Sequence, residues 1–309
     1  MMIGRRALVV TVLMLLAAAP PQGQEATSLL GKPLVAAPQS AEARAALEKN
    51  LAAARAEYEK DPDDADAIIW LGRRLGYLGR YRDAIAAFSE GIDKHPEDAR
   101  MYRHRGHRHI SVRELDKAVA DLSKAASLVE GRPDEVEPDG QPNARNIPTS
   151  TLKTNVYYHL ALAHYLRDDF EQALEGWRQC ERYSKNPDML VATTHWLYMT
   201  LRRLDRAGEA RQALEPISAG MDIIENRSYH RLLLLYKGIE KADALEAAVK
   251  SGGLDAVTLG YGLGNWHLYN GRRDQAMSLF REIVEQHANQ WPAFGYLAAE
   301  AELARLRAQ

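Results

Sequence analysis

The chain has 309 residues, enough to bury a large core as one or two domains or as one elongated array. Its formal net charge is −2, from 40 lysines and arginines against 42 aspartates and glutamates, so gross charge argues neither for nucleic acid nor for an anionic membrane surface as partner. Alanine, leucine, arginine and glutamate are abundant. They favour helix, because their side chains lose little rotamer freedom there.

Residues 1–24 have the pattern of a secretory signal peptide. Arg5 and Arg6 give a basic start, and an apolar run over residues 7–19 is interrupted only by Thr11. This run is shorter than the roughly 20 residues of a membrane-spanning helix. We therefore expect an exported protein, periplasmic or secreted, of a bacterial cell envelope, with an uncleaved membrane anchor as the alternative. The only cysteine, Cys180, rules out an internal disulfide and is expected to pack as a small apolar residue.

One set of residues recurs along residues 65–290, and each copy has the pattern of two antiparallel helices. The fullest copy contains Leu71, Gly72, Gly79, Tyr81, Ala84, Phe88 and Pro96. A later copy contains Leu263, Gly264, Gly271, Ala276 and Phe280. A small residue midway along the first helix allows close approach, the next glycine ends that helix, and the aromatic residue fills the space between helices. Stacked copies would then share one continuous core.

These copies resemble the tetratricopeptide repeat (TPR), whose period is 34 residues. The resemblance implies an all-α fold, a right-handed superhelical solenoid of antiparallel helix pairs. Repeats 1 and 2 would occupy residues 65–130, and repeats 3 to 6 would occupy residues 154–290, with 228–256 degenerate. Two residues depart from the pattern: Arg105 stands where it has leucine, and Arg113 where it usually has glycine.

The segments around the repeats carry their own predictions. Residues 25–40 are expected to be a flexible leader, residues 41–64 an N-terminal capping helix and residues 291–309 a C-terminal capping helix. Residues 131–153 contain four prolines and four acidic residues, so they do not continue a helix. We interpret this segment as a Pro-rich acidic insertion loop in solvent, with a lid or contact arm as the sharper alternative.

The sequence has no motif of a hydrolase, a phosphate-binding loop or a structural zinc site, which predicts a non-catalytic protein without cofactor or metal. His104 and His107 share a helix face at a spacing that metals use, but three neighbouring arginines disfavour a cation there. A histidine also stands at the same place in three copies, where a hydrogen-bonded core role is expected: His109, His164 and His267.

The resemblance also implies a ligand groove, because the first helices of TPR proteins line a concave face. The groove positions map onto Arg73, Arg103, His107, Asn155, Tyr158, His195, Met199, Arg202, Tyr261 and Asn265. Such a basic and aromatic lining suits an anionic peptide or protein, because guanidinium groups bind carboxylates bidentately and tyrosines add contact area at low entropy cost. For each single residue, a structural ion pair between repeats is an equal alternative.

The resulting hypothesis is a non-catalytic protein–protein interaction or scaffold module of the cell envelope. It would bind a peptide or partner protein in the groove, without nucleic acid and without a stable membrane span after signal cleavage. The alternative is a small-molecule-binding or enzymatic protein that uses the Arg/His cluster of repeat 2. A deep pocket joining Arg103, His107, Tyr158 and His195 would favour that alternative. A third possibility is an architectural subunit, which an exposed apolar patch away from the groove would favour.

Overall fold

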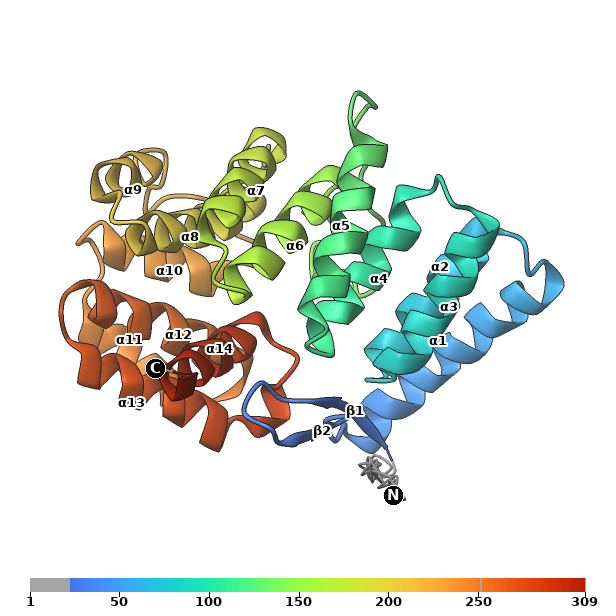
Figure 1. The fold of residues 1–309 in the computed structure, drawn as a ribbon, viewed down its shortest axis with the longest axis horizontal. Helices are drawn as coiled ribbons and strands as arrows, with labels where there is room; N and C mark the ends of the chain where they lie inside the picture. Colours follow the sequence, from blue (N-terminus) through green and yellow to red (C-terminus); the bar gives the residue numbers. More distant parts are fainter. Residues whose placement is uncertain (1–22, 251, 309) are drawn as a thin grey trace, which may run out of the picture.

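Antiparallel helix pairs make up most of the computed structural model, which describes residues 23–250 and 252–308 (Figure 1). Nearly all of the predicted signal peptide lies outside the described residues. The first helices of the pairs are α2 (Ala65–Tyr77), α4 (Ala99–Ser111), α6 (Leu152–Leu166), α8 (Pro187–Arg203), α10 (Arg227–Tyr236) and α12 (Gly253–Tyr269). The second helices are α3 (Tyr81–Lys94), α5 (Leu115–Val129), α7 (Phe170–Tyr183), α9 (Ala207–Ala213), α11 (Ala242–Val249) and α13 (Arg273–Gln286). This arrangement confirms the predicted helical solenoid.

Single elements flank the pairs at both ends. Helix α1 (Ala41–Lys60) packs on α2, and α14 (Phe294–Ala308) follows a short 3-10 helix, Ala288–Gln290. The connection between α5 and α6 runs over residues 130–151 and contains no helix. Within the described part of the chain, every helix is too short or too polar to cross a membrane.

The two helices of each pair meet at a turn with left-handed backbone. A positive φ occurs at Gly79, Arg113, Asp168, Asp205, Gly238 and Gly271. In the first pair, the N–H of Arg80 then donates to the carbonyl oxygen of Leu75 at 3.1 Å, and the other pairs repeat this contact. It satisfies a carbonyl that the helix end leaves open. Glycine adopts this conformation without strain and aspartate tolerates it, whereas arginine at position 113 is unusual there.

A glycine in the first helix faces a large side chain of the second helix. A Cβ atom on Gly72 would lie 2.5 Å from the ring of Phe88, and one on Gly264 would lie 2.4 Å from the ring of Phe280. Both rings are almost fully buried. The close approach expected from the sequence pattern is therefore present in the first and the last pair.

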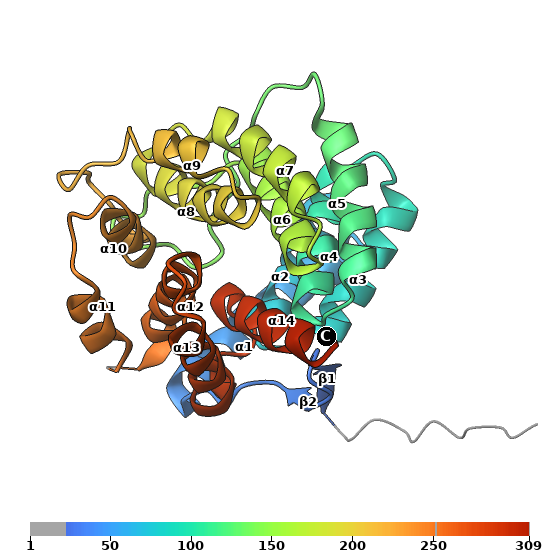
Figure 2. The ribbon, with the colours of Figure 1, turned by 60° about the vertical axis from the view of Figure 1, so that its left-hand side comes forward.

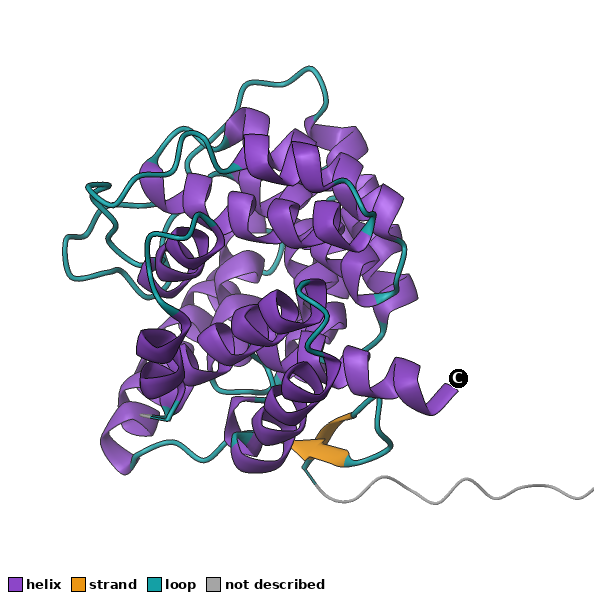
Figure 3. Cartoon of the chain, turned by 90° about the vertical axis from the view of Figure 1, so that its left-hand side faces the viewer, coloured by secondary structure: helices purple, strands orange, loops and turns teal. Residues whose placement is uncertain are grey.

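Residues 24–35 form a β-hairpin in place of the expected flexible leader. Strand β1 (Gln24–Thr27) pairs antiparallel with β2 (Pro33–Val35), beside the C-terminal helix (Figure 3). Ala26 and Leu34 are buried, and the indole Nε1 of Trp291 donates to the carbonyl oxygen of Val35 at 2.7 Å. The hairpin is ordered because it covers the junction between the two ends of the array, which sequence periodicity does not reveal.

Helix α14 turns back and lies beside α6, α12 and α13 (Figure 2). Two of the non-glycine turn residues pair with it. Arg113 Nη2 lies 2.8 Å from Glu300 Oε2, and Arg305 Nε lies 3.0 Å from Asp168 Oδ2. Both side chains of the Arg113–Glu300 pair are almost completely buried, at 3% and 0% exposed. These contacts close the array on its inner side.

Candidate ligand-binding surface

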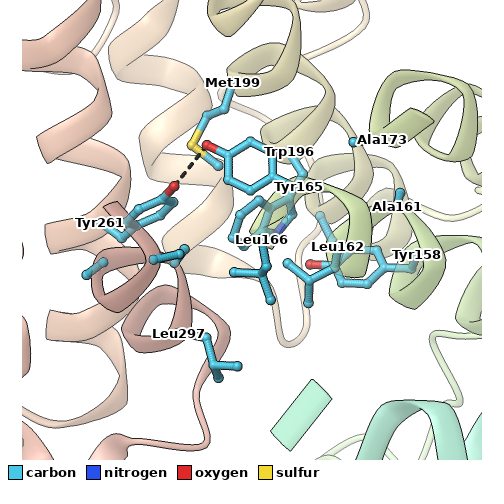
Figure 4. Packing of buried hydrophobic residues seen from close by; sticks show 14 of the residues in the cluster. Tyr158, Ala161, Leu162, Tyr165, Leu166, Ala173, Trp196, Met199, Tyr261 and Leu297 are labelled. Carbon is cyan, nitrogen blue, oxygen red and sulfur yellow. Dashed lines mark hydrogen bonds between the residues drawn. The ribbon is translucent and has the colours of Figure 1, made fainter. Parts of the chain in front are cut away.

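Five of the ten predicted groove residues lie in the core. They are Tyr158, His195, Met199, Tyr261 and Asn265, and the exposed fraction of each is at most 7%. Figure 4 labels Tyr158, Met199 and Tyr261. Tyr261 shares a hydrogen bond of 2.9 Å with the Tyr165 hydroxyl, and the ring of Tyr158 lies 6.1 Å from that of Phe294 in α14.

This burial shifts the pKa values of the ionisable groups. Burial raises the pKa of Tyr158 and Tyr261 well above the ordinary value and lowers the pKa of His195 to about 3. These groups are therefore neutral at physiological pH, and a ligand reaches them only when the core opens. Their part in ligand binding stays a prediction.

Four other predicted residues gather around a single carboxylate, Glu137 of the α5–α6 connection. Arg103 Nη2 lies 3.0 Å from Glu137 Oε1, and Asn155 Nδ2 donates to Glu137 Oε2 at 3.1 Å. Arg73 contacts the neighbouring residue of the same connection, because its Nη2 donates to the carbonyl oxygen of Pro138 at 2.7 Å. His107 shares a small cavity with Arg73, Arg103 and Glu137. The sequence-predicted residues of repeats 1 to 3 thus converge on one place.

This cavity, which we name the arginine pocket, has a volume of about 120 Å³. Its lining is Gly72, Arg73, Gly76, Tyr77, Phe88, Arg103, His104, His107, Arg108 and Glu137. The lining thus holds three arginines and one carboxylate; Arg103 pairs with that carboxylate, whereas Arg108 donates to the His107 ring at 2.8 Å. Arg103 Nε has no hydrogen-bond acceptor, and no carboxylate of the described residues pairs with Arg108. Burial lowers the pKa of Arg108 to about 10, which still leaves it charged near neutral pH.

The two histidines of the pocket add no positive charge. Burial lowers the pKa of both His104 and His107 well below the ordinary value, and the neighbouring arginines lower it further. His104 Nδ1 lies 2.9 Å from Arg103 Nη1 and accepts its hydrogen bond, which requires an unprotonated nitrogen. The ring of His107 packs 4.2 Å from that of His159. These imidazoles form walls of the pocket, and the described residues contain no group of three metal-ligating side chains.

A second cavity, of about 300 Å³, shares His107 as a wall with the arginine pocket. Its lining includes Tyr229, Asp255 and Phe294. Neither of these two cavities is lined by Tyr158 or His195, so neither is the deep pocket joining Arg103, His107, Tyr158 and His195 that would favour a small-molecule or enzymatic role.

The remaining residues of interest have structural partners. Arg105, at a leucine position of the repeat pattern, forms a two-pronged contact with Asp121 at 2.7 Å for each nitrogen. Arg202 lies apart from the pocket and donates to the carbonyl oxygen of Tyr269 at 3.1 Å. The recurring histidines each contact the residue five positions later: His109 with Glu114, His164 with Asp169 and His267 with Arg272. His109 and His267 are buried, as expected of core histidines, whereas His164 is half-buried.

Sequence reasoning missed Arg108 and Tyr77 as pocket residues. Arg108 follows His107 directly, so it lies off the groove stripe of its helix, and only the packing of α2 against α4 turns it into the pocket. Glu137 was recognisable as one of several acids in an insertion. Nothing in its local sequence indicates that it lies against Arg103.

Comparison with known proteins supports the repeat assignment. Residues 259–289, which include most of α12 and all of α13, match the family described as Tetratricopeptide repeat. No curated protein matches the chain. Solved structures similar to it include PilF of Pseudomonas aeruginosa, at 17% identity over 82% of this chain and 90% of that chain with a TM-score of 0.46.

Two further structures have comparable similarity. YrrB, titled a TPR protein with an unusual peptide-binding site, is 14% identical over 81% of this chain and 98% of that chain, with a TM-score of 0.43. Yeast Tom70 is 15% identical over 88% of this chain and 62% of that chain, with a TM-score of 0.40. All three TM-scores lie below 0.5, so none of these proteins indicates the partner of this one.

Proposed function

We propose that this protein is a non-catalytic interaction scaffold that binds an acidic segment of a partner protein at the arginine pocket. The repeat match over residues 259–289 and the stacked helix pairs support a binding scaffold. The observation that carries the choice of an acidic partner is the excess of positive charge, because the pocket lining holds Arg73, Arg103 and Arg108 but only one carboxylate, that of Glu137.

The chemistry of the pocket fits a carboxylate. A guanidinium group presents several donors in a fixed plane, and its bonds to an ionised oxygen are stronger than bonds between neutral groups. Arg103 is only 7% exposed, so an incoming carboxylate would meet a charge that water already screens poorly. A neutral ligand that displaced Glu137 would leave the charge of Arg103 uncompensated, which disfavours it.

We further propose that the scaffold works in the cell envelope. The support is the basic and apolar pattern of residues 1–24. N-terminal sequencing of the protein purified from an envelope fraction tests this directly. A start near residue 25 supports export with cleavage, retention of Met1 in a membrane fraction supports an anchor, and recovery only from cytoplasm contradicts the location.

The test of function is capture of partners from an envelope extract by the full-length chain with a C-terminal tag. The variant is Arg73→Gln with Arg103→Gln, and the control is Arg44→Gln with Arg178→Gln, which removes equal charge from exposed ion pairs. We expect recovery of a specific partner to fall about tenfold or more in the pocket variant alone. Equal recovery by both variants would move the interaction away from the pocket.

A further inference from the structure

A segment of the chain itself lies on the proposed binding surface. Residues 134–140 of the α5–α6 connection cross the inner side of α2 and α4. Arg73 Nη2 donates to the carbonyl oxygen of Pro138 at 2.7 Å, and Arg74 Nη1 donates to that of Gly140 at 2.8 Å. Arg103 and Asn155 hold the two oxygens of Glu137. The segment is thus recognised through backbone carbonyls and one carboxylate, as an extended peptide is.

The backbone of the segment is locally extended. Val136 forms an isolated antiparallel bridge with Thr151, and the N–H of Glu137 donates to the carbonyl oxygen of Ser150 at 3.3 Å. Such a conformation exposes alternate side chains to the surface beneath and to solvent. Glu137 is directed at Arg103, whereas the neighbouring Val136 is 63% exposed. Polar contacts, with little apolar burial, therefore hold the segment in place.

The fit of the segment to the surface is incomplete. Glu137, the one carboxylate of the pocket lining, pairs with Arg103, and no ion pair within the described residues joins a carboxylate to Arg73 or Arg108. Asp139 brings a second acid nearby, but its Oδ2 is buried without a hydrogen-bond partner, and burial raises the pKa of its carboxyl. A peptide that placed a second carboxylate against Arg108 would satisfy more of the pocket than residues 134–140 do.

The rest of the connection is anchored separately. Arg145 pairs with Asp222 through contacts of 2.6 and 2.8 Å, and the Thr149 hydroxyl donates to Glu225 at 3.0 Å. Asn186 donates to the carbonyl oxygen of Thr149 at 2.8 Å. These contacts hold residues 143–149 against the α8 and α10 region, so residues 134–140 have their own set of contacts to release.

We infer that residues 134–140 are an internal ligand of the scaffold. They occupy the surface of α2, α4 and α6 that the partner uses, and an extended peptide with two or more carboxylates binds after displacing them. This inference rests on the proposed function and adds its regulation. In the free protein, residues 134–140 cover the pocket in most molecules. The apparent affinity for a partner is lowered accordingly, because only the molecules with an uncovered pocket can bind it.

The test uses a fluorescent peptide with the sequence of residues 133–140, Pro-Asp-Glu-Val-Glu-Pro-Asp-Gly, and its binding to the full-length chain by fluorescence anisotropy. The first variant is Glu137→Gln, and Glu130→Gln is its control, since Glu130 is an exposed acid at the end of α5. A second variant replaces residues 134–140 by seven glycines and serines. Far-UV circular dichroism checks that each variant is folded.

We expect the peptide to bind the glycine–serine variant about tenfold or more tightly than wild type, with Glu137→Gln in between and Glu130→Gln equal to wild type. Adding Arg103→Gln to the glycine–serine variant should abolish the gain. Equal affinity of wild type and the glycine–serine variant would overturn the inference, as would no binding to either or a gain that survives Arg103→Gln. If one of these results occurred while partner capture still depended on Arg73 and Arg103, the internal-ligand inference would be wrong and the proposed function would still hold.

Discussion

The buried ion pair between Arg113 and Glu300 gives the sharpest prediction for stability. Arg113 occupies a turn with φ of 65°, where glycine is the ordinary residue of the repeat. Its guanidinium contacts Glu300 at 2.8 Å and the carbonyl oxygen of Trp291 at 2.9 Å, and Glu300 also accepts from the N–H of Leu29. One pair thereby joins the α4–α5 turn, α14 and the N-terminal hairpin.

Replacement of Arg113 by glycine separates two opposing effects. Removing one partner of a buried ion pair costs about 3–5 kcal/mol, because the remaining charge is left buried and unpaired. Relief of the left-handed backbone returns about 1 kcal/mol. We therefore expect Arg113→Gly to lower the free energy of unfolding by about 2–4 kcal/mol. Backbone preference alone predicts the opposite sign.

The assay is urea-induced unfolding at neutral pH, followed by far-UV circular dichroism. The double variant Arg113→Gly/Glu300→Gln removes the unpaired charge and keeps an acceptor for Leu29, so it should be more stable than Arg113→Gly alone. Arg44→Ala is the control, since its exposed pair with Glu48 should contribute under about 1 kcal/mol. An Arg113→Gly protein as stable as wild type would refute the reasoning.

Three further predictions concern the core. The neutral, buried imidazoles His107 and His195 have a pKa below the ordinary value, so protons bind the unfolded chain more readily. Stability should be full above about pH 6.5 and should fall below it, by about 1.4 kcal/mol per pH unit for His195, whose pKa is about 3, and by a further amount for His107. Urea midpoints that are equal at neutral and mildly acidic pH would contradict this. Gly72→Ala should lower the free energy of unfolding by about 1–3 kcal/mol, because the new Cβ clashes with Phe88. Gly208→Ala, in an exposed helix with nothing within 4 Å, should raise the free energy of unfolding by about 0.5–1 kcal/mol. Equal shifts of the thermal midpoint would disprove the packing argument. Burial raises the pKa of the Cys180 thiol to about 12, so a thiol reagent should label the unfolded but not the native protein, and rapid native labelling would show that the site opens.

The local features of the repeats were predictable because they depend on neighbours in sequence. Gly79 and Gly271 end their helices in the left-handed conformation that the pattern indicates. Gly72 approaches Phe88 as the small-to-large pairing predicts. Each of these contacts joins residues in the same helix pair, so one copy of the repeat contains all the information needed.

The closure of the array was not predictable by the same means. Arg113 and Glu300 are 187 positions apart, and neither residue has a local pattern that indicates the other. Arg113 was visible only as a departure from the repeat. Tyr261 is also buried in the closed array. Its burial could not be predicted, because periodicity gives the helix face of a residue but not the elements that cover that face. Arg73, in repeat 1, stays half-buried, because residues of the α5–α6 connection and not α14 lie against it.

The central claim is that a partner contacts the inner surface of α2 and α4, and site-specific photocrosslinking tests it most directly. A benzophenone side chain replaces Trp70, which lines the cavity under residues 134–140, or Ser127, which is exposed on α5. Irradiation in envelope extract should give a partner adduct from position 70 that disappears with Arg103→Gln, and none from position 127. Adducts from position 127 alone, or adducts at position 70 that are indifferent to Arg103, would contradict the account.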